Sequence, residues 1–301
     1  MSEITVAIHP FWTFDIDVPG AKIIRWDFES APPAGGADIV VTSHWAKPDA
    51  VELAQKAGAS LLQIGSIGFD MIDPDALGSL RVANAKTVHE PATAETVVLD
   101  LLIALRDVPR MMANSANKNW EPFYAPGLTD KEIVLVGVGG VGSQIAQRLE
   151  AFNAHITYVA SRERDEDFGH VYALDTAPDS VWAKADGVIT VIPATDQTRG
   201  IINKDFLAKL KDGAVVLNAG RGVLAVNEDL VSEKDRLRIV LDVADPEPLP
   251  ADSALWDAAF FISHHTGGNT DAMQPRMKAV VEQQIHAALN GDDFINVVLP
   301  K

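Results

Sequence analysis

Short apolar runs rich in valine, isoleucine and leucine alternate along this chain with segments whose apolar residues recur at helical spacing. Strands that are apolar on both sides occur in parallel sheets that helices cover on each face. The alternation therefore predicts an α/β fold built on doubly wound parallel sheets. The predicted strands are 4–8, 37–42, 60–65, 132–137, 155–160, 187–192, 214–220 and 238–243.

A predicted long helix over 91–111 separates these strands into two groups, because Pro91 suits a first helical turn and apolar residues then recur on one face. A second long helix is predicted near the C-terminus, ending at Asn290 and Gly291. The short apolar segment after it is expected to return to the N-terminal group. We therefore expect a discontinuous substrate-binding domain, 1–92 with 272–301, and a cofactor domain, 93–271.

Composition limits the classes of function. With 301 residues, 47% of them hydrophobic, the chain can bury two large cores. The net charge of -17 argues against nucleic acid and anionic membrane surfaces as partners. No apolar run approaches the roughly 20 residues that span a bilayer, and the first residues do not resemble a secretion signal. The chain has no cysteine, which excludes disulfides and thiolate metal sites; we expect a cytoplasmic protein without a metal centre.

A glycine-rich turn follows the predicted strand 132–137. Gly137, Gly139 and Gly142 have G-x-G-x-x-G spacing and open an amphipathic helical segment. In such turns the glycines allow a tight bend, a close approach to a pyrophosphate and close helix–strand packing. The amides of Gly140 and Val141 then point at the anion from the positive end of the helix. A purely structural glycine turn is the alternative, but this context favours a dinucleotide site.

The end of the next predicted strand bears on the choice of cofactor. An NAD site needs an acidic residue where this chain has Ala160. Ser161 and Arg162 instead offer a hydroxyl and a guanidinium, which suit a 2′-phosphate. The same residues also fit a solvated loop of mixed charge. We expect NADP(H) to be favoured over NAD(H).

Three polar clusters follow later strands: Arg221 in NAGRG, Asp242 and Glu247 in LDVADPEPLP, and the histidines of ISHHTGG. Segments 64–73 and 192–203 precede these clusters in the chain. Together, these separated motifs make the chain resemble the D-isomer-specific 2-hydroxyacid dehydrogenase family. The shorter N-terminal half resembles the glyoxylate and hydroxypyruvate reductase branch. The resemblance implies two Rossmann- or flavodoxin-like domains with the active site in the cleft between them, and a homodimer.

The resemblance also assigns roles. Arg221 is the substrate-binding arginine, Glu247 the carboxylate partner and His265 the proton donor, with His264 where the family usually has proline. Asp242 is expected to meet the nicotinamide amide or ribose, and the alternative is that it caps the following turn. The remaining positions are Ile67 and Gly68 for the substrate carboxylate, and Ile192, Pro193 and Ala219 for the cofactor.

Reduction of a 2-keto acid delivers a hydride to the carbonyl carbon and a proton to its oxygen, so an acid that titrates near neutrality is needed there. A carboxylate stabilises the resulting imidazolium form, and a guanidinium orients the substrate. We therefore expect an NAD(P)H-dependent reductase that converts a small 2-keto acid to the D-2-hydroxy acid. A dinucleotide-sensing, co-repressor-like protein on the same scaffold is the alternative, although sensing needs none of these three side chains.

Three aromatic side chains have no assigned role in this pattern. His44 and Trp45 follow the second predicted strand, where they either line the substrate site or pack. Trp120 lies in a turn-rich connection and serves either packing or a subunit contact.

Overall fold

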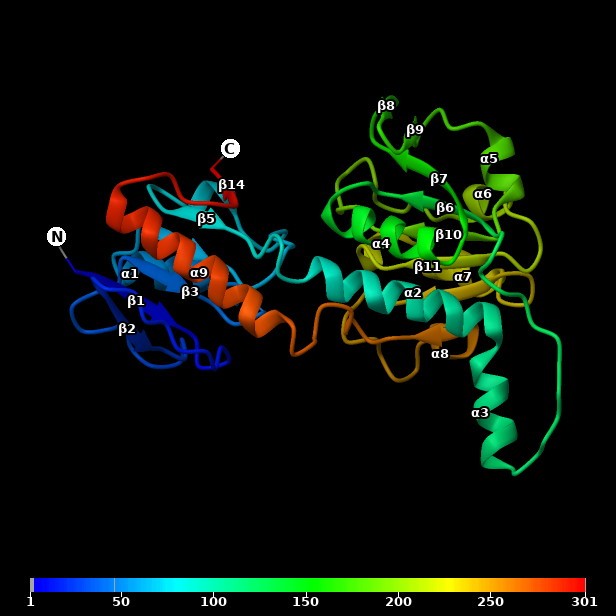
Figure 1. The fold of residues 1–301 in the computed structure, drawn as a ribbon, viewed down its shortest axis with the longest axis horizontal. Helices are drawn as coiled ribbons and strands as arrows, with labels where there is room; N and C mark the ends of the chain where they lie inside the picture. Colours follow the sequence, from blue (N-terminus) through cyan, green and yellow to red (C-terminus); the bar gives the residue numbers. More distant parts are fainter. Residues whose placement is uncertain (1–2, 46, 301) are drawn as a thin grey trace. The chain divides into compact units, whose positions relative to one another are not determined.

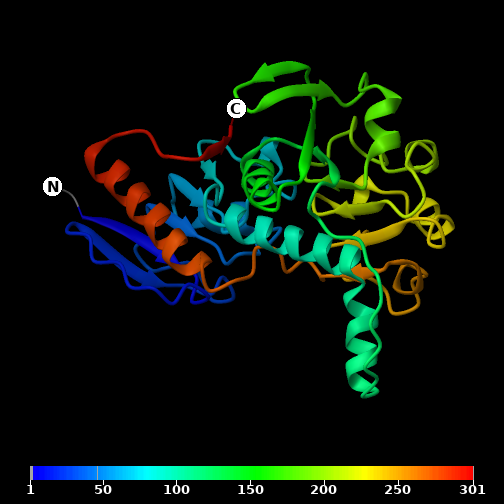
Figure 2. The same cartoon turned by 45° about the vertical axis from the view of Figure 1, so that its right-hand side comes forward.

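The computed structural model describes residues 3–45 and 47–300. The chain divides into two compact units, Met1–His89 with Thr270–Lys301, and Glu90–Asn269, each built on its own sheet (Figures 1 and 2). Both sheets are mostly parallel, which confirms the predicted α/β class. Within 3–45 and 47–300, no helix combines the length and the apolar character that crossing a membrane requires.

The first unit contains, in its described residues, a six-stranded sheet in the order β14-β5-β4-β3-β1-β2. Its strands run parallel except β14, which is antiparallel to β5. Helix α9 packs on one face and α1 on the other, so the sheet is buried on both sides. The elements are β1 Ile4–Ile8, β2 Ala21–Arg25, β3 Ile39–Val41, α1 Ala50–Lys56, β4 Leu61–Gln63, η1 Pro74–Ala76, β5 Arg81–Ala83, α9 Met273–Asn290 and β14 Val297–Leu299.

The second unit contains, in residues 90–269, an eight-stranded sheet in the order β13-β12-β11-β10-β6-β7-β9-β8. Helices α2 and α4 cover one face, and α5, α6, α7 and α8 cover the other. The strands are β6 Glu132–Val136, β7 His155–Ala160, β8 Arg164–Glu166, β9 Gly169–Ala173, β10 Gly187–Thr190, β11 Val215–Asn218, β12 Arg238–Leu241 and β13 Phe261–Ile262. The helices are α2 Glu90–Arg106, α3 Val108–Ala116, α4 Gly140–Ala151, α5 Asp179–Lys184, α6 Lys204–Leu207, η2 Gly222–Leu224, α7 Asn227–Ser232 and α8 Leu255–Ala258.

The prediction of one helix over 91–111 is wrong. The backbone breaks at Asp107, which lies in the left-handed region at φ 52°, and α3 then leaves in a new direction (Figure 1). Helix α2 buries a broad face, whereas α3 has no buried residue. The predicted end of α9 is confirmed, since Gly291 caps it at φ 75°.

The candidate residues of the second unit follow the carboxyl ends of parallel strands. Gly137 follows β6, Ser161 follows β7, Ala219 follows β11 and Asp242 follows β12. The carboxyl ends of parallel strands meet at one edge of the sheet, which is where open α/β sheets bind ligands. The fold therefore brings these segments, distant in sequence, to a common edge.

Candidate active site

The glycine turn after β6 requires glycine at positions 137 and 142. Gly137 has φ +114°, and a Cβ on Gly142 would lie 1.9 Å from the carbonyl oxygen of Gly137. A Cβ on Gly139, by contrast, would meet nothing within 4 Å. Helix α4 then starts at Gly140 with no side-chain cap. The turn therefore fits a dinucleotide: it packs the helix tightly on the strand and leaves open backbone at the positive helix end.

The loop after β7 places two polar side chains in solvent. Ala160 is buried, and Ser161 and Arg162 follow it as exposed residues. Arg164 lies in the β8–β9 hairpin, where its Nε donates to Glu166 Oε1 over 2.6 Å. The position where an acidic residue would hold a ribose is thus occupied by Ala160, and the hydroxyl of Ser161 and the guanidinium of Arg162 follow it directly.

Arg221 lies in an extended segment between β11 and η2, at φ -144°. Its Nη1 donates to the carbonyl of Gly220 over 2.8 Å, and its own carbonyl accepts from Asn218 Nδ2 over 2.8 Å. A Cβ on Gly222 would lie 2.0 Å from the carbonyl oxygen of Ala244. The chain after β11 therefore packs directly on the chain after β12, where Glu247 lies.

His265 and Glu247 form a hydrogen-bonded pair. Nδ1 of His265 lies 2.7 Å from Oε2 of Glu247, and the amide of Ala244 donates to Oε1 over 2.9 Å. Burial alone raises the pKa of Glu247, but the hydrogen bonds from His265 and Ala244 and the charges of His265 and Arg221 lower it overall. The carboxylate is therefore ionised at neutral pH and oriented from both sides. The structure thus brings the three predicted catalytic residues into one electrostatic group.

The two histidines occupy the centre of a tight turn. His264 and His265 have φ 57° and 53°, and Thr266 donates to the carbonyl of Ser263 through its amide (3.3 Å) and its hydroxyl (2.6 Å). Two successive positive φ values are the signature of a type I′ turn. Proline fixes φ near -65°, so the proline that the family usually has at position 264 is incompatible with this turn.

Asp242 holds that turn. It is buried, and its Oδ1 accepts from the Ser263 hydroxyl at 2.9 Å and the Thr266 amide at 3.1 Å. Its carbonyl accepts from the amide of His265. Asp242 therefore holds a turn that is remote in the sequence, not the turn that directly follows it. Sequence reasoning missed the further acid of this group, Asp100 of α2, whose hydrogen bond to Ser263 is 2.7 Å long.

Ile67 and Gly68 lie in the first unit, in the loop after β4. Their carbonyls are engaged locally: Asn84 Nδ2 donates to Ile67 over 2.8 Å, and the Ser66 hydroxyl donates to Gly68 over 2.7 Å. Both residues are partly exposed. The side chains of Ser66 and Asn84 therefore fix the backbone of this loop from both sides.

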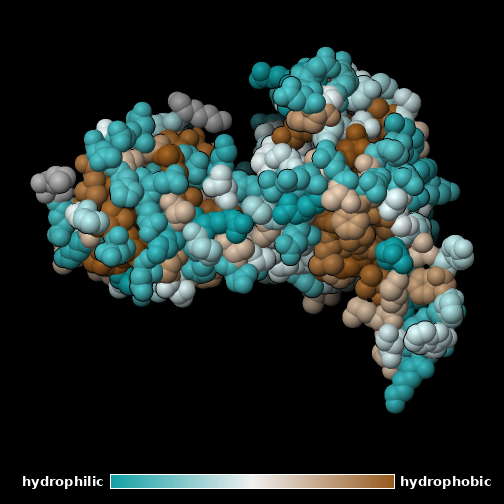
Figure 3. Space-filling view, in the orientation of Figure 1, coloured by the Kyte–Doolittle hydropathy of each residue, from teal (hydrophilic) through white to brown (hydrophobic). Residues whose placement is uncertain are grey.

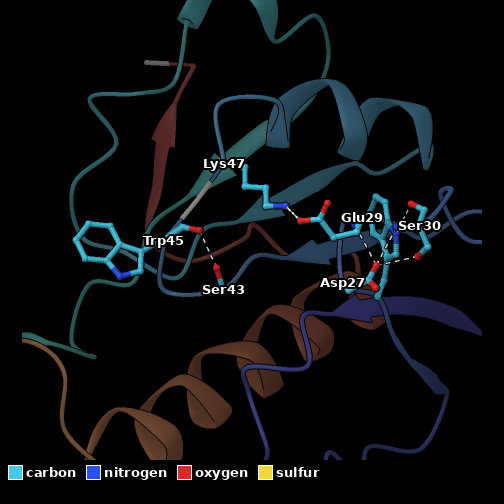
Figure 4. A network of polar contacts seen from close by, with 7 residues as sticks. Asp27, Glu29, Ser30, Ser43, Trp45 and Lys47 are labelled. Carbon is cyan, nitrogen blue, oxygen red and sulfur yellow. Dashed lines mark hydrogen bonds and ion pairs between the residues drawn. The ribbon is translucent and has the colours of Figure 1, made fainter. Parts of the chain in front are cut away.

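Residues 43–45 form another loop of the first unit. The ring of His44 stacks on Phe11 with centroids 4.2 Å apart, and burial first, then the charges of His89 and His9, lower its pKa. Trp45 is half exposed, and its carbonyl accepts from the Ser43 hydroxyl over 2.7 Å (Figure 4). Figure 4 also shows Lys47 paired with Glu29. His44 is thus a packed residue, whereas the indole of Trp45 faces solvent.

Comparison with known proteins shows which family the chain is similar to. The family model described as "D-isomer specific 2-hydroxyacid dehydrogenase, NAD binding domain" matches residues 98–267. The human glyoxylate reductase/hydroxypyruvate reductase is 28% identical over 295 residues, 93% of this chain and 88% of that protein. D-3-phosphoglycerate dehydrogenase of Mycobacterium bovis is 30% identical over 276 residues, 87% of this chain, which spans about half (51%) of that protein.

Two solved structures share the fold over nearly the whole chain. A D-isomer specific 2-hydroxyacid dehydrogenase family protein of Aeromonas salmonicida has a TM-score of 0.86 at 24% identity, covering 99% of each chain. The NADPH-dependent glyoxylate/hydroxypyruvate reductase of Sinorhizobium meliloti, solved with NADP and sulfate, has a TM-score of 0.80 at 23% identity, covering 99% of this chain and 98% of that one. The chain, whose residues 98–267 form the nicotinamide-dinucleotide domain, belongs to the D-isomer-specific 2-hydroxyacid dehydrogenase family.

Proposed function

We propose that this protein reduces a small 2-keto acid, of the glyoxylate or hydroxypyruvate kind, to the D-2-hydroxy acid. The hydrogen-bonded pair of His265 and Glu247, with the charge of Arg221 acting on the same carboxylate, carries the proposal. An acid, an orienting carboxylate and a guanidinium are the groups that a carbonyl reduction needs. Relatives named glyoxylate reductase/hydroxypyruvate reductase support the substrate class.

His265 is the proposed proton donor. Because Nδ1 faces Glu247, Nε2 is the ring nitrogen assigned to the substrate oxygen. Glu247 fixes the tautomer and favours the charged ring, and the turn held by Asp242 fixes the direction of the ring. The bound dinucleotide supplies the hydride. Protonation by His265 neutralises the oxygen as the negative charge develops.

Arg221 is the proposed substrate-binding residue. A guanidinium can hold the carboxylate of the keto acid through paired hydrogen bonds and orient the carbonyl carbon for attack. The backbone amides of Ile67 and Gly68 are the other proposed substrate contacts. Their partly exposed loop and the fixed carbonyls of both residues support this assignment.

The proposed cofactor is NADP(H) in preference to NAD(H). The pyrophosphate is assigned to the turn from Gly137 to Gly142, and the 2′-phosphate to Ser161 and Arg162. Support comes from the open backbone at Gly139 and from the buried alanine at the end of β7. The other proposed cofactor contacts are Ile192, Pro193, Ala219 and Asp242.

Steady-state kinetics test the function. The purified protein is mixed with NADPH or NADH and a panel of glyoxylate, hydroxypyruvate, pyruvate and branched 2-keto acids, and cofactor oxidation is followed. We expect turnover with at least one small acid, faster with NADPH. Tight dinucleotide binding without turnover of any acid contradicts the proposal and favours a dinucleotide sensor. Turnover that is faster with NADH contradicts only the cofactor preference.

We also propose that the protein forms a homodimer through α3 and the return segment 117–127. This arm leaves the body of the second unit (Figures 1 and 2), and Arg110 fixes the return segment on α3 through Glu121 at 3.0 Å and the ring of Phe123 at 4.2 Å. Trp120 and Tyr124 are almost fully exposed. A hydrophobic area also lies over the part of the second unit where α2 leads to α3 (Figure 3). A twofold contact buries two such surfaces at once.

Light scattering after size exclusion tests the dimer. The double variant Trp120→Glu, Tyr124→Glu is expected to be a monomer. Phe168→Glu, an exposed aromatic on the β8–β9 turn, is the matched control and is expected to leave the mass unchanged. A monomeric native protein, or a double variant with the native mass, contradicts the proposal.

A further inference from the structure

Asp100 is a fully buried carboxyl group in the middle of helix α2. Its neighbours along the helix face, Val97, Leu101 and Ala104, are part of the apolar core. Oδ2 lies 2.7 Å from the Ser263 hydroxyl, whereas Oδ1 is buried without a hydrogen-bond partner among the described residues. A buried carboxylate charge with one oxygen that accepts no hydrogen bond destabilises the folded protein, so the surroundings favour the neutral acid.

The hydrogen atoms around Ser263 lead to the same conclusion. Its Oγ lies within hydrogen-bond distance of two carboxyl groups, 2.7 Å from Asp100 Oδ2 and 2.9 Å from Asp242 Oδ1. A hydroxyl has one hydrogen to donate. Both contacts are hydrogen bonds only if one carboxyl carries a proton. Asp242 Oδ1 also accepts from the Thr266 amide, which stabilises its negative charge, so the proton belongs on Asp100.

We propose that Asp100 is a positioning residue for the reduction: as a neutral acid it donates to Ser263, Ser263 donates to Asp242, and this relay holds the turn that carries His265. The inference rests on the proposed function. Asp242 contacts the turn at both ends, through the Ser263 hydroxyl and the Thr266 amide. Loss of the Asp100 proton leaves two carboxylates competing for one hydroxyl hydrogen, and the turn loosens.

The same face of α2 contacts the turn at other points. The Thr96 hydroxyl, one helical turn before Asp100, donates to the carbonyl of Gly267 over 3.4 Å. A Cβ on Gly267 would lie 3.3 Å from the Thr93 methyl and 2.8 Å from Asp242 Oδ2. The helix therefore lies against the turn over two of its own turns, and the carboxyl group of Asp100 forms one end of that contact.

Of the charged groups around α2, Asp242 at the end of β12 acts on Asp100. Arg238, at the start of β12, donates to the Ala104 carbonyl, and Arg148 of α4 bonds Gln144 within its own helix. Strands β11 and β13 carry no charged side chain within their described ranges. Burial first, and then the charge of Asp242, raise the pKa of Asp100 to about 7 despite the hydrogen bond from Ser263.

Two substitutions test the relay. The amide of Asp100→Asn donates to Ser263 as the neutral acid does and has no proton to lose. The side chain of Asp100→Leu has a similar volume and donates nothing. We expect D100N to keep the native kcat/KM near pH 6 and to exceed the native protein above pH 7, while D100L loses about tenfold to a hundredfold at every pH. Any pH dependence of the reaction itself is common to the native protein and D100N. Identical pH profiles of these two, or a fully active D100L, overturn the inference.

A second measurement does not depend on activity. The folded pKa of about 7 exceeds the ordinary 3.8, so between these values the folded protein binds more protons at Asp100 than the unfolded chain. This contribution to stability falls as pH rises through that window, and D100N lacks it. The urea midpoint of D100N relative to the native protein is therefore expected to rise between about pH 4 and pH 7 and then level off. A constant difference overturns the inference, even if turnover is found; the expected rise without turnover contradicts only the proposed function.

Discussion

His265 Nδ1 and Glu247 Oε2 lie 2.7 Å apart although both side chains remain 34% exposed. The two residues come from different loops, one after β12 and one after β13, and backbone contacts fix each of them. Ala244 donates to the carboxylate, and the carbonyl of Asp242 accepts from the amide of His265. An imidazole oriented in this way is preorganised, because it does not have to search for its direction when a substrate arrives.

Replacing His265 by alanine is expected to lower kcat by about 10² to 10⁴-fold, because a positioned general acid contributes this much. His264→Ala is the matched control. Its ring lies 5.8 Å from that of Trp256, outside the pair with Glu247, so we expect a much smaller loss. Steady-state kinetics with the best keto acid, and cofactor titration by fluorescence, check both variants. A comparable loss in both, or weaker cofactor binding in H265A, contradicts the assignment of the proton donor.

Glu247→Gln is expected to lower kcat/KM at neutral pH by about tenfold, since the amide no longer stabilises the charged imidazole.

The same variant is also expected to change how the stability of the protein depends on pH. The folded pKa of Glu247 lies below its ordinary 4.5, so its contribution is present above that pH and is lost as the pH falls through the lowered value. On acidification below about 4.5, the native protein therefore loses more stability than E247Q. Urea unfolding of both proteins from neutral pH down to about pH 3 measures this difference in stability. If the stability of the two proteins falls equally with pH, the pairing of Glu247 with His265 is contradicted.

The sequence predicted the strands with long apolar runs but missed other elements. Strand β1 has the predicted bounds, and β6 and β12 are shortened at their ends. Strand β2 is an edge strand with exposed Lys22 and Arg25, and β5 has only three residues, so neither has a distinctive pattern. The break at Asp107 did leave a signal, since Pro109 lies in the first turn of α3 and a proline inside a helical pattern marks a break, although the apolar spacing continues across it.

The sequence predicted the catalytic residue types and their order along the chain. It did not predict the residues that hold them in place. Arg221, Glu247 and His265 stand in recognisable segments. The left-handed turn at His264 depends on Asp242, which is distant in sequence and acts only after folding. Asp100 did leave a signal: an acid on the helix face whose other members are apolar. An acidic residue is almost never fully buried unless it is paired. The sequence alone is therefore enough to make Asp100 a candidate for a buried acid with a hydrogen-bond partner.

Arg162→Ala is expected to change the choice of cofactor rather than the reaction. A guanidinium bonded to a phosphate contributes about 1.5 to 3 kcal/mol, so kcat/KM with NADPH should fall by about 10- to 100-fold while that with NADH stays close to native. Arg164→Ala is the control, since that side chain is paired with Glu166. Kinetics with both cofactors at low and at moderate salt separate the variants. An equal loss with NADPH and NADH means that Arg162 does not contact the 2′-phosphate.

Two alanine substitutions in the glycine turn are expected to fail in different ways. On Gly139 a methyl group meets nothing in the protein within 4 Å, so G139A should keep the native unfolding midpoint. Its methyl group would point into the space assigned to the pyrophosphate, so we expect cofactor affinity to fall by at least about tenfold.

On Gly142 the methyl carbon would lie 1.9 Å from the carbonyl oxygen of Gly137, which is backbone and cannot rotate away. G142A should therefore lose several kcal/mol of stability, about 3 or more, through overpacking between helix and strand. Thermal unfolding with and without NADPH distinguishes the two. Native cofactor affinity in G139A places the pyrophosphate elsewhere, and a stable G142A contradicts the tight packing of α4 on β6.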